Sequence, residues 1–147
     1  MKASHFLESY RDFAAEPVFD SAANMSYVQV IDDDPGIVDL LFSLLHDVEG
    51  FAVRTAYSVR QVLAESPVMP PALILLDVSL PGEDVLVAAE RLHALPDWQH
   101  VPVVICSGND RLDAIAARIG ATGYLHKPFD LDEVAAVAER YAQRQRP

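Results

Sequence analysis

The chain has 147 residues, which is the size of one domain and long enough to bury a sizeable hydrophobic core. Its 22 acidic and 11 basic residues give a formal net charge of −11, which disfavours binding to nucleic acid or to anionic membrane surfaces. A hydrophobic fraction of 51% argues against a disordered chain. With no apolar run of membrane-spanning length, no sign of a signal peptide and a single cysteine, Cys106, we expect a reduced, cytoplasmic protein without membrane insertion.

Residues 1–26 are predicted to form an N-terminal extension that is separate from the domain after it. Phe6, Tyr10 and Phe13 share one helical face, which indicates a short amphipathic helix. Pro17 is expected to end that helix, and the residues that follow have the composition of a linker. We therefore expect residues 27–147 to form the domain and residues 1–24 to be dispensable for its folding.

From Tyr27 onward, short apolar runs alternate with segments whose apolar residues recur at helical spacing. The runs predict strands at 27–31, 51–56, 72–76, 101–106 and 122–126, and the periodic segments predict helices at 37–48, 58–65, 85–95, 112–119 and 134–141. In the first helix the predicted apolar stripe includes Leu40 and Val48. Five strand–helix units predict an α/β fold with a parallel sheet and right-handed crossovers.

Four of the predicted strands end in charged or hydroxyl side chains, and in chain order these are Asp32, Asp33, Asp34, Asp77, Ser107 and Lys127. Because the carboxyl ends of parallel strands meet at one edge of the sheet, we expect these side chains to lie together. Carboxylates crowded into one crevice repel one another, and a divalent cation offsets that repulsion. Mg²⁺ fits because it binds carboxylates, keeps water ligands and accepts phosphate oxygens. Asp34 is predicted to begin the first helix rather than to bind the metal.

This set of side chains predicts phosphoryl-transfer chemistry at Asp77. A carboxylate can act as a nucleophile toward phosphorus. The metal and Lys127 can neutralise the spread negative charge of the transferred group, and the Ser107 hydroxyl can donate a hydrogen bond to one of its oxygens.

Four segments resemble the receiver domains of two-component response regulators: Val-Ile-Asp-Asp-Asp-Pro at 30–35, Leu-Leu-Asp-Val-Ser-Leu-Pro-Gly at 75–82, Val-Ile-Cys-Ser-Gly at 104–108 and Tyr-Leu-His-Lys-Pro-Phe at 124–129. One such motif is weak evidence, but four in this order, each at the end of a predicted strand, are highly specific. The resemblance covers about residues 27–145. It implies a flavodoxin-like, doubly wound sheet of five parallel strands in the order 2-1-3-4-5 with five helices.

The resemblance also implies roles for individual residues. Asp77 would be the phosphoacceptor, Lys127 would contact the phosphoryl group, and Ser107 and Tyr124 would be the switch residues. The bond between Lys127 and Pro128 is expected to be cis. The implied Mg²⁺ ligands are Asp33, Asp77, the backbone carbonyl of Ser79 and, mainly through a bound water, Asp32.

One position departs from the family pattern. Receivers usually have glycine where the third helix begins, whereas this chain has Val85, which leaves the conformation and mobility of the preceding loop open. Tyr124 has an alternative interpretation as plain core packing. Cys106 is expected to be buried and inert. His126 is expected to point away from its neighbour Lys127, because side chains alternate along a strand.

The resemblance implies a signalling phosphoacceptor, with Mg²⁺-dependent self-phosphorylation and slow self-dephosphorylation, rather than an ordinary enzyme. The expected phosphoryl donor is a sensor histidine kinase or a histidine phosphotransfer protein. Because no output domain follows the fifth helix, we expect a stand-alone receiver. Its downstream partner would be a protein that binds the face of the fourth helix, fifth strand and fifth helix, and not nucleic acid.

Three other functions share part of this sequence pattern. A flavodoxin-like FMN binder is disfavoured because the chain has Asp32, Asp33 and Asp34 where that protein needs a phosphate loop rich in Ser, Thr and Gly. A haloacid-dehalogenase-type phosphatase is disfavoured because Ser79 stands where a second aspartate is needed. A receiver-like binding module that works without phosphorylation stays open as the alternative.

Overall fold

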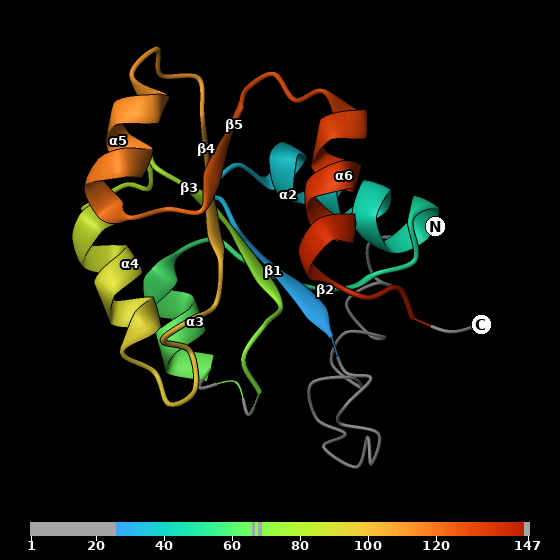
Figure 1. The fold of residues 1–147 in the computed structure, drawn as a ribbon, viewed down its shortest axis with the longest axis horizontal. Coiled ribbons are helices and arrows are strands. Elements are labelled where there is room, and N and C mark those ends of the chain that lie inside the picture. The colour runs from blue at the N-terminus through green and yellow to red at the C-terminus, as the bar shows by residue number, and fades with distance from the viewer. Residues whose placement is uncertain (1–25, 66, 68, 146–147) are drawn as a thin grey trace.

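A computed structural model of the chain describes residues 26–65, 67 and 69–145 (Figure 1). The predicted helix and linker of the N-terminal extension lie outside the described residues. The predicted alternation of strands and helices is confirmed, and the elements in chain order are β1 (Tyr27–Ile31), α2 (Pro35–Phe42), η2 (Ser43–Val48), β2 (Ala52–Ala56), α3 (Val59–Glu65), β3 (Leu73–Asp77), α4 (Val85–His93), β4 (Val103–Ser107), α5 (Leu112–Ile119), β5 (Gly123–His126) and α6 (Leu131–Tyr141). None of the described helices is long and apolar enough to cross a bilayer.

The five strands form one parallel sheet in the order β2-β1-β3-β4-β5, as the family resemblance implied. β1 pairs with β2 on one side and with β3 on the other, so that Val30 lies beside both Thr55 and Leu75. Because β1 and β3 are neighbours and run in the same direction, the residues that follow them arrive at the same edge of the sheet.

Helices cover both faces of the sheet, and each face has its own core (Figure 1). α2, η2 and α6 cover one face and α3, α4 and α5 the other. Side chains of β1 alternate between the two cores: Val30 packs on the α2 and α6 side, and Ile31 packs on the α3, α4 and α5 side. This alternation explains why the central strands are mostly apolar on both sides, since both of their faces are buried.

Aspartates begin three of the helices. Oδ1 of Asp34 accepts a hydrogen bond of 2.8 Å from the Gly36 N–H, and Oδ1 of Asp84 accepts one of 2.9 Å from the Leu86 N–H. Asp130 begins α6 in the same way. Each carboxylate thus satisfies backbone donors that the first helical turn leaves free. The prediction that Asp34 begins the first helix is confirmed.

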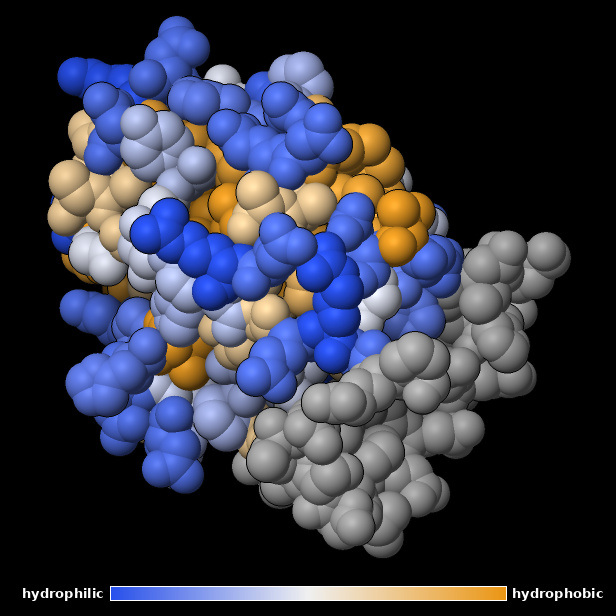
Figure 2. All heavy atoms as spheres, turned by 45° about the vertical axis from the view of Figure 1, so that its right-hand side comes forward, coloured by the Kyte–Doolittle hydropathy of each residue, from blue (hydrophilic) through white to orange (hydrophobic). Residues whose placement is uncertain are grey.

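The predicted stripe of the first helix is wrong at two residues. Leu40 is 40% exposed and Val48 is 71% exposed, while Leu41 and Leu45 are buried. α2 continues into η2, a π-helical stretch in which the Glu49 N–H donates to the Leu44 carbonyl at 3.0 Å. The wider π-helical turns change the angle between successive side chains. Ordinary α-helical spacing therefore places Val48 on the buried face, whereas the π-helical stretch turns it to solvent. Figure 2 shows the molecule from the side of α2 and α6, where apolar side chains emerge between hydrophilic ones.

The loop from Asp77 to α4 has a conformation that accommodates Val85 in place of the usual glycine. Val85 is the first residue of α4, it is half-buried, and the residue before it has extended backbone with φ −82° and ψ 127°. The left-handed residue of this loop is Gly82, with a φ of 71°. A β carbon added at Gly82 would meet no atom within 4 Å, so glycine is needed there for its backbone and not for space. Valine at 85 is therefore compatible with the turn.

Candidate functional site

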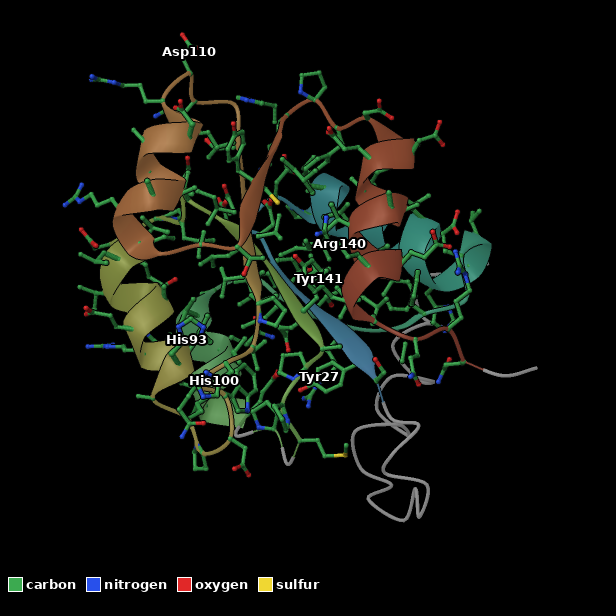
Figure 3. All side chains as sticks on the ribbon, viewed as in Figure 1. Tyr27, His93, His100, Asp110, Arg140 and Tyr141 are labelled. Carbon is green, nitrogen blue, oxygen red and sulfur yellow. The ribbon has the colours of Figure 1, made fainter. Side chains whose placement is uncertain are left out.

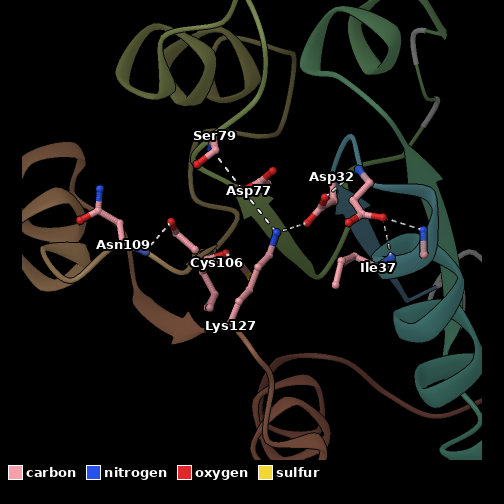
Figure 4. Close-up of polar contacts among 11 residues, drawn as sticks. Asp32, Ile37, Asp77, Ser79, Cys106, Asn109 and Lys127 are labelled. Atoms are coloured by element: carbon pink, nitrogen blue, oxygen red, sulfur yellow. Dashed lines mark hydrogen bonds and ion pairs between the residues drawn. The ribbon is translucent and has the colours of Figure 1, made fainter.

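The predicted site residues meet at the carboxyl ends of the strands. Figure 3 shows Tyr27, at the start of β1, toward the lower end of the molecule, and Asp110, which follows β4, at the upper end. β1 and β3 run in parallel, so Asp32 and Asp77 lie together at this end of the sheet (Figure 4). The sheet order brings these residues together although they lie far apart in sequence.

Three carboxylates form a compact acidic cluster at this edge. Asp32, Asp33 and Asp77 each place one oxygen within 4.8 Å of the other two. Asp32 is 2% exposed and Asp77 is 4% exposed, whereas Asp33 is open to solvent. Hard oxygen donors at this spacing suit one small divalent cation that keeps part of its water shell. The solvent-exposed side of the cluster, at Asp33, leaves room for those water ligands. The donor set therefore fits Mg²⁺.

Lys127 reaches into the acidic cluster from the end of β5. Its Nζ lies 2.7 Å from Oδ2 of Asp32 and 3.5 Å from Oδ1 of Asp77 (Figure 4). The other oxygen of Asp32 accepts a hydrogen bond of 3.0 Å from the Asp34 N–H. The bond between Lys127 and Pro128 is cis, as the resemblance implied. The lysine thus supplies the positive charge that the clustered carboxylates need.

The surroundings raise the pKa of both Asp77 and Lys127, which disfavours the charged form of Asp77 and favours the charged form of Lys127. Burial, together with the nearby charge of Asp32 and a hydrogen bond with Asp33, raises the pKa of Asp77, although the Ser79 N–H and Lys127 act against this rise. Burial alone would lower the pKa of Lys127, but its hydrogen bond to Asp32 and the charges of Asp32 and Asp77 raise it instead. Lys127 is therefore held as a cation, while the ionised form of Asp77 is disfavoured until a cation compensates it.

The loop after β3 is tied to the phosphoacceptor candidate. The Ser79 N–H donates to Oδ1 of Asp77 at 3.1 Å. Cys106, beside Asp77 in the sheet, is 2% exposed, and burial raises the pKa of its thiol. The expectation of a buried cysteine is confirmed, and its raised pKa keeps it in the unreactive thiol form.

Ser107 and Tyr124 occupy different surroundings. Ser107 is 3% exposed, and its hydroxyl oxygen accepts a hydrogen bond of 3.0 Å from the Asn109 N–H. Tyr124 is 43% exposed, and its ring meets the His126 ring edge to face, with 5.6 Å between the ring centroids. The alternative interpretation of Tyr124 as core packing is therefore wrong.

Glu83 is a residue that the sequence did not single out. Its two carboxylate oxygens accept hydrogen bonds of 3.0 Å each from the backbone N–H groups of Val59 and Arg60, at the start of α3. It thus joins the loop after Asp77 to a helix 24 residues earlier in the chain. No local pattern marks this contact, because an acidic residue in an exposed loop ordinarily needs no partner.

The family model of the response regulator receiver domain matches residues 28–139. The chain belongs to this family. Receiver domains are the signalling phosphoacceptors of two-component systems; they bind Mg²⁺ through acidic residues and interact with histidine kinases and downstream partners. The function class that the four motifs predicted is confirmed at this level.

Individual relatives agree with the family assignment. The nitrogen assimilation regulatory protein NtrX of Azorhizobium caulinodans is 35% identical over 116 residues, which are 77% of this chain and 25% of that protein. The KDP operon transcriptional regulatory protein KdpE of Escherichia coli is 34% identical over 114 residues, which are 76% of this chain and 49% of that protein. The chain thus spans half or less of these curated relatives.

A solved structure agrees as well. The receiver domain of NtrX from Brucella abortus superposes with a TM-score of 0.67 at 35% identity, covering 78% of this chain and 96% of that one. The flavodoxin-like fold implied by the resemblance is confirmed by this likeness and by the strand order.

Proposed function

We propose that this chain is a phosphorelay switch in which Asp77 accepts a phosphoryl group from a histidine kinase or a histidine phosphotransfer protein. The observation that carries the proposal is the position of Asp77. Its carboxylate is buried at the end of β3, lies within 4.8 Å of two further carboxylates, and has the ammonium of Lys127 at 3.5 Å. A cluster that served only to bind a cation would not need a positively charged lysine beside its carboxylates.

In the proposed step, a carboxylate oxygen of Asp77 attacks the phosphorus of a phosphohistidine. The new P–O bond forms as the P–N bond breaks, and the electron pair of that bond stays on the imidazole, which takes a proton from solvent. The product is an acyl phosphate on Asp77. Lys127 neutralises charge on the transferred group. The Ser107 hydroxyl can donate to a phosphoryl oxygen while it accepts from Asn109, because a hydroxyl does both.

Asp33, Asp77 and the backbone carbonyl of Ser79 would hold Mg²⁺. When bound, the cation offsets the repulsion among the carboxylates and neutralises the phosphoryl oxygens. Both oxygens of Asp32 already have partners, Lys127 and the Asp34 N–H. This arrangement supports the indirect role, through a bound water, that we assign to Asp32.

The output of the switch would be a protein–protein contact in the cytoplasm. Tyr124 lies exposed on β5, between α5 and α6, and this face is where we place the downstream partner. Phosphorylation would draw Ser107 toward the phosphoryl group and let Tyr124 rotate inward. This rotation would change the surface of this chain that the partner binds. The phosphoryl group selects a conformation that exists beforehand, because it binds that conformation better. We assign the chain slow self-phosphorylation from small acyl phosphates and slow loss of the phosphoryl group.

The test is phosphorylation in solution. The protein is incubated with acetyl phosphate, and separately with a phosphorylated histidine phosphotransfer protein, with and without Mg²⁺. We expect a hydroxylamine-sensitive label that requires Mg²⁺, maps to the peptide containing Asp77 and disappears in Asp77→Asn, because an amide is no nucleophile there. A label on Asp32 or Asp33 would overturn the site assignment. Absence of any label with both donors would favour a receiver-like binding module that works without phosphorylation.

A further inference from the structure

His126 is a neighbour of both residues that we assign to the switch. In the parallel pairing of β4 with β5, Ser107 lies beside His126 and Ile105 lies beside Tyr124. Neighbours in register direct their side chains to the same side of a sheet, and so do residues two apart on one strand. His126 therefore shares one sheet face with both Ser107 and Tyr124.

The ring of His126 holds a defined contact with Tyr124. The ring centroids lie 5.6 Å apart and the planes meet at 84°, which is the edge-to-face geometry that aromatic pairs prefer. Tyr124 is 43% exposed in this arrangement, so the contact is made with the tyrosine turned outward. An inward rotation of Tyr124 toward Ser107 would break it.

The position of β5 explains why this contact can exist. β5 is the edge strand of the described sheet, so its outer side has no strand beside it, and Tyr124 and His126 are both exposed there. Leu125, between them, points to the opposite face and packs in the core under α2 and α6. The two aromatic rings are thus left to pack on each other at the open edge.

We infer that His126 is a positioning residue of the switch: its ring stabilises the outward rotamer of Tyr124 and so lowers the fraction of molecules that are ready to accept the phosphoryl group. This inference rests on the proposed function. The apparent affinity for a ligand of the inward conformation equals the intrinsic affinity multiplied by the fraction of molecules in that conformation. Removing the His126 ring therefore raises that affinity.

The test compares His126→Ala with His126→Phe, which keeps an aromatic edge, and with Thr122→Ala, an exposed control just before β5. The first measurement is the χ1 rotamer population of Tyr124 by NMR in the ligand-free protein. The second is a titration with beryllium fluoride, a phosphoryl mimic, in saturating Mg²⁺. We expect His126→Ala to move Tyr124 toward the inward rotamer and to bind beryllium fluoride about twofold to tenfold more tightly, the factor that one aromatic contact supplies. His126→Phe and Thr122→Ala should match the wild type.

Unchanged Tyr124 rotamers in His126→Ala, or an affinity that is equal or weaker, would overturn the inference. If the wild type bound no beryllium fluoride, the proposed function would fail. The rotamer measurement would then still judge the role of His126, because it needs no ligand.

Discussion

The ammonium of Lys127 lies closer to Asp32 than to Asp77, with Nζ–Oδ distances of 2.7 Å and 3.5 Å. The lysine therefore pairs first with the carboxylate of β1, and its contact with the phosphoacceptor candidate is the longer one. A divalent cation in the same cluster would feel this charge at short range, so the ammonium and the metal compete for the acidic residues.

Lys127→Ala should therefore tighten Mg²⁺ binding. Loss of one unit charge a few ångströms from the cation should raise the affinity on the order of tenfold. Titration calorimetry with Mg²⁺ measures the effect, and Lys127→Arg, which keeps the charge, is the matched control. A weaker affinity in Lys127→Ala would mean that the lysine orders the site rather than competing with the metal. The same variant should lose phosphorylation-dependent output, because its charge faces the phosphoryl group.

The raised pKa of Asp77 predicts that the free energy of unfolding of the metal-free protein depends on pH. A carboxyl whose pKa is higher in the folded than in the unfolded state favours folding when protonated. That contribution is complete below the ordinary value of 3.8 and is lost as the pH rises through the folded pKa. Asp77→Asn cannot ionise, so it should be more stable than the wild type at pH 7 and equally stable at a pH below 3.8. Urea unfolding in chelator across this range measures the difference, and saturating Mg²⁺ should reduce it. An equal gap at all pH values would assign the effect to packing instead.

The contact of Glu83 with α3 predicts a loss of stability. Glu83→Ala removes the acceptor of two backbone N–H groups, which should lower the free energy of unfolding by about 1–3 kcal/mol. Glu83→Gln keeps one acceptor oxygen and should lose less. Urea unfolding gives the magnitude, and faster hydrogen exchange at the amides of Val59 and Arg60 would locate it. If both variants unfolded like the wild type, the contact would contribute nothing in solution.

Val85→Gly introduces the residue that the family usually has. Because Val85 lies in the first turn of α4 and the left-handed residue is Gly82, glycine at 85 should weaken the helix and remove the packing of the Val85 side chain on the core, without changing the turn. We expect a loss of about 1–2 kcal/mol in unfolding free energy. The Mg²⁺ affinity should not change. A large change in Mg²⁺ affinity would show that this position controls the loop that carries Ser79.

The sequence alone determined the order of the elements and the residues that stand at the strand ends. Periodicity is a property of neighbouring residues, so a buried strand that ends in Asp77, or a helix that begins after Asp34, can be identified without knowledge of the rest of the chain. The rule that parallel strands present their carboxyl ends at one edge then predicts that Asp32, Asp77 and Lys127 gather there. Where the local periodicity changes, as in η2, the same reasoning failed at Val48.

Only the tertiary structure decided which of these residues touch. Lys127 and Asp32 are 95 residues apart, and the preference for Asp32 over Asp77 depends on less than 1 Å between strands that no local pattern encodes. The contact of Glu83 with Val59 joins a loop to the first turn of α3, and the two are close only because α3 and α4 pack side by side on one face of the sheet. The exposure of Tyr124 follows from the place of β5 at the edge: the same alternating residues in a central strand would be buried on both faces.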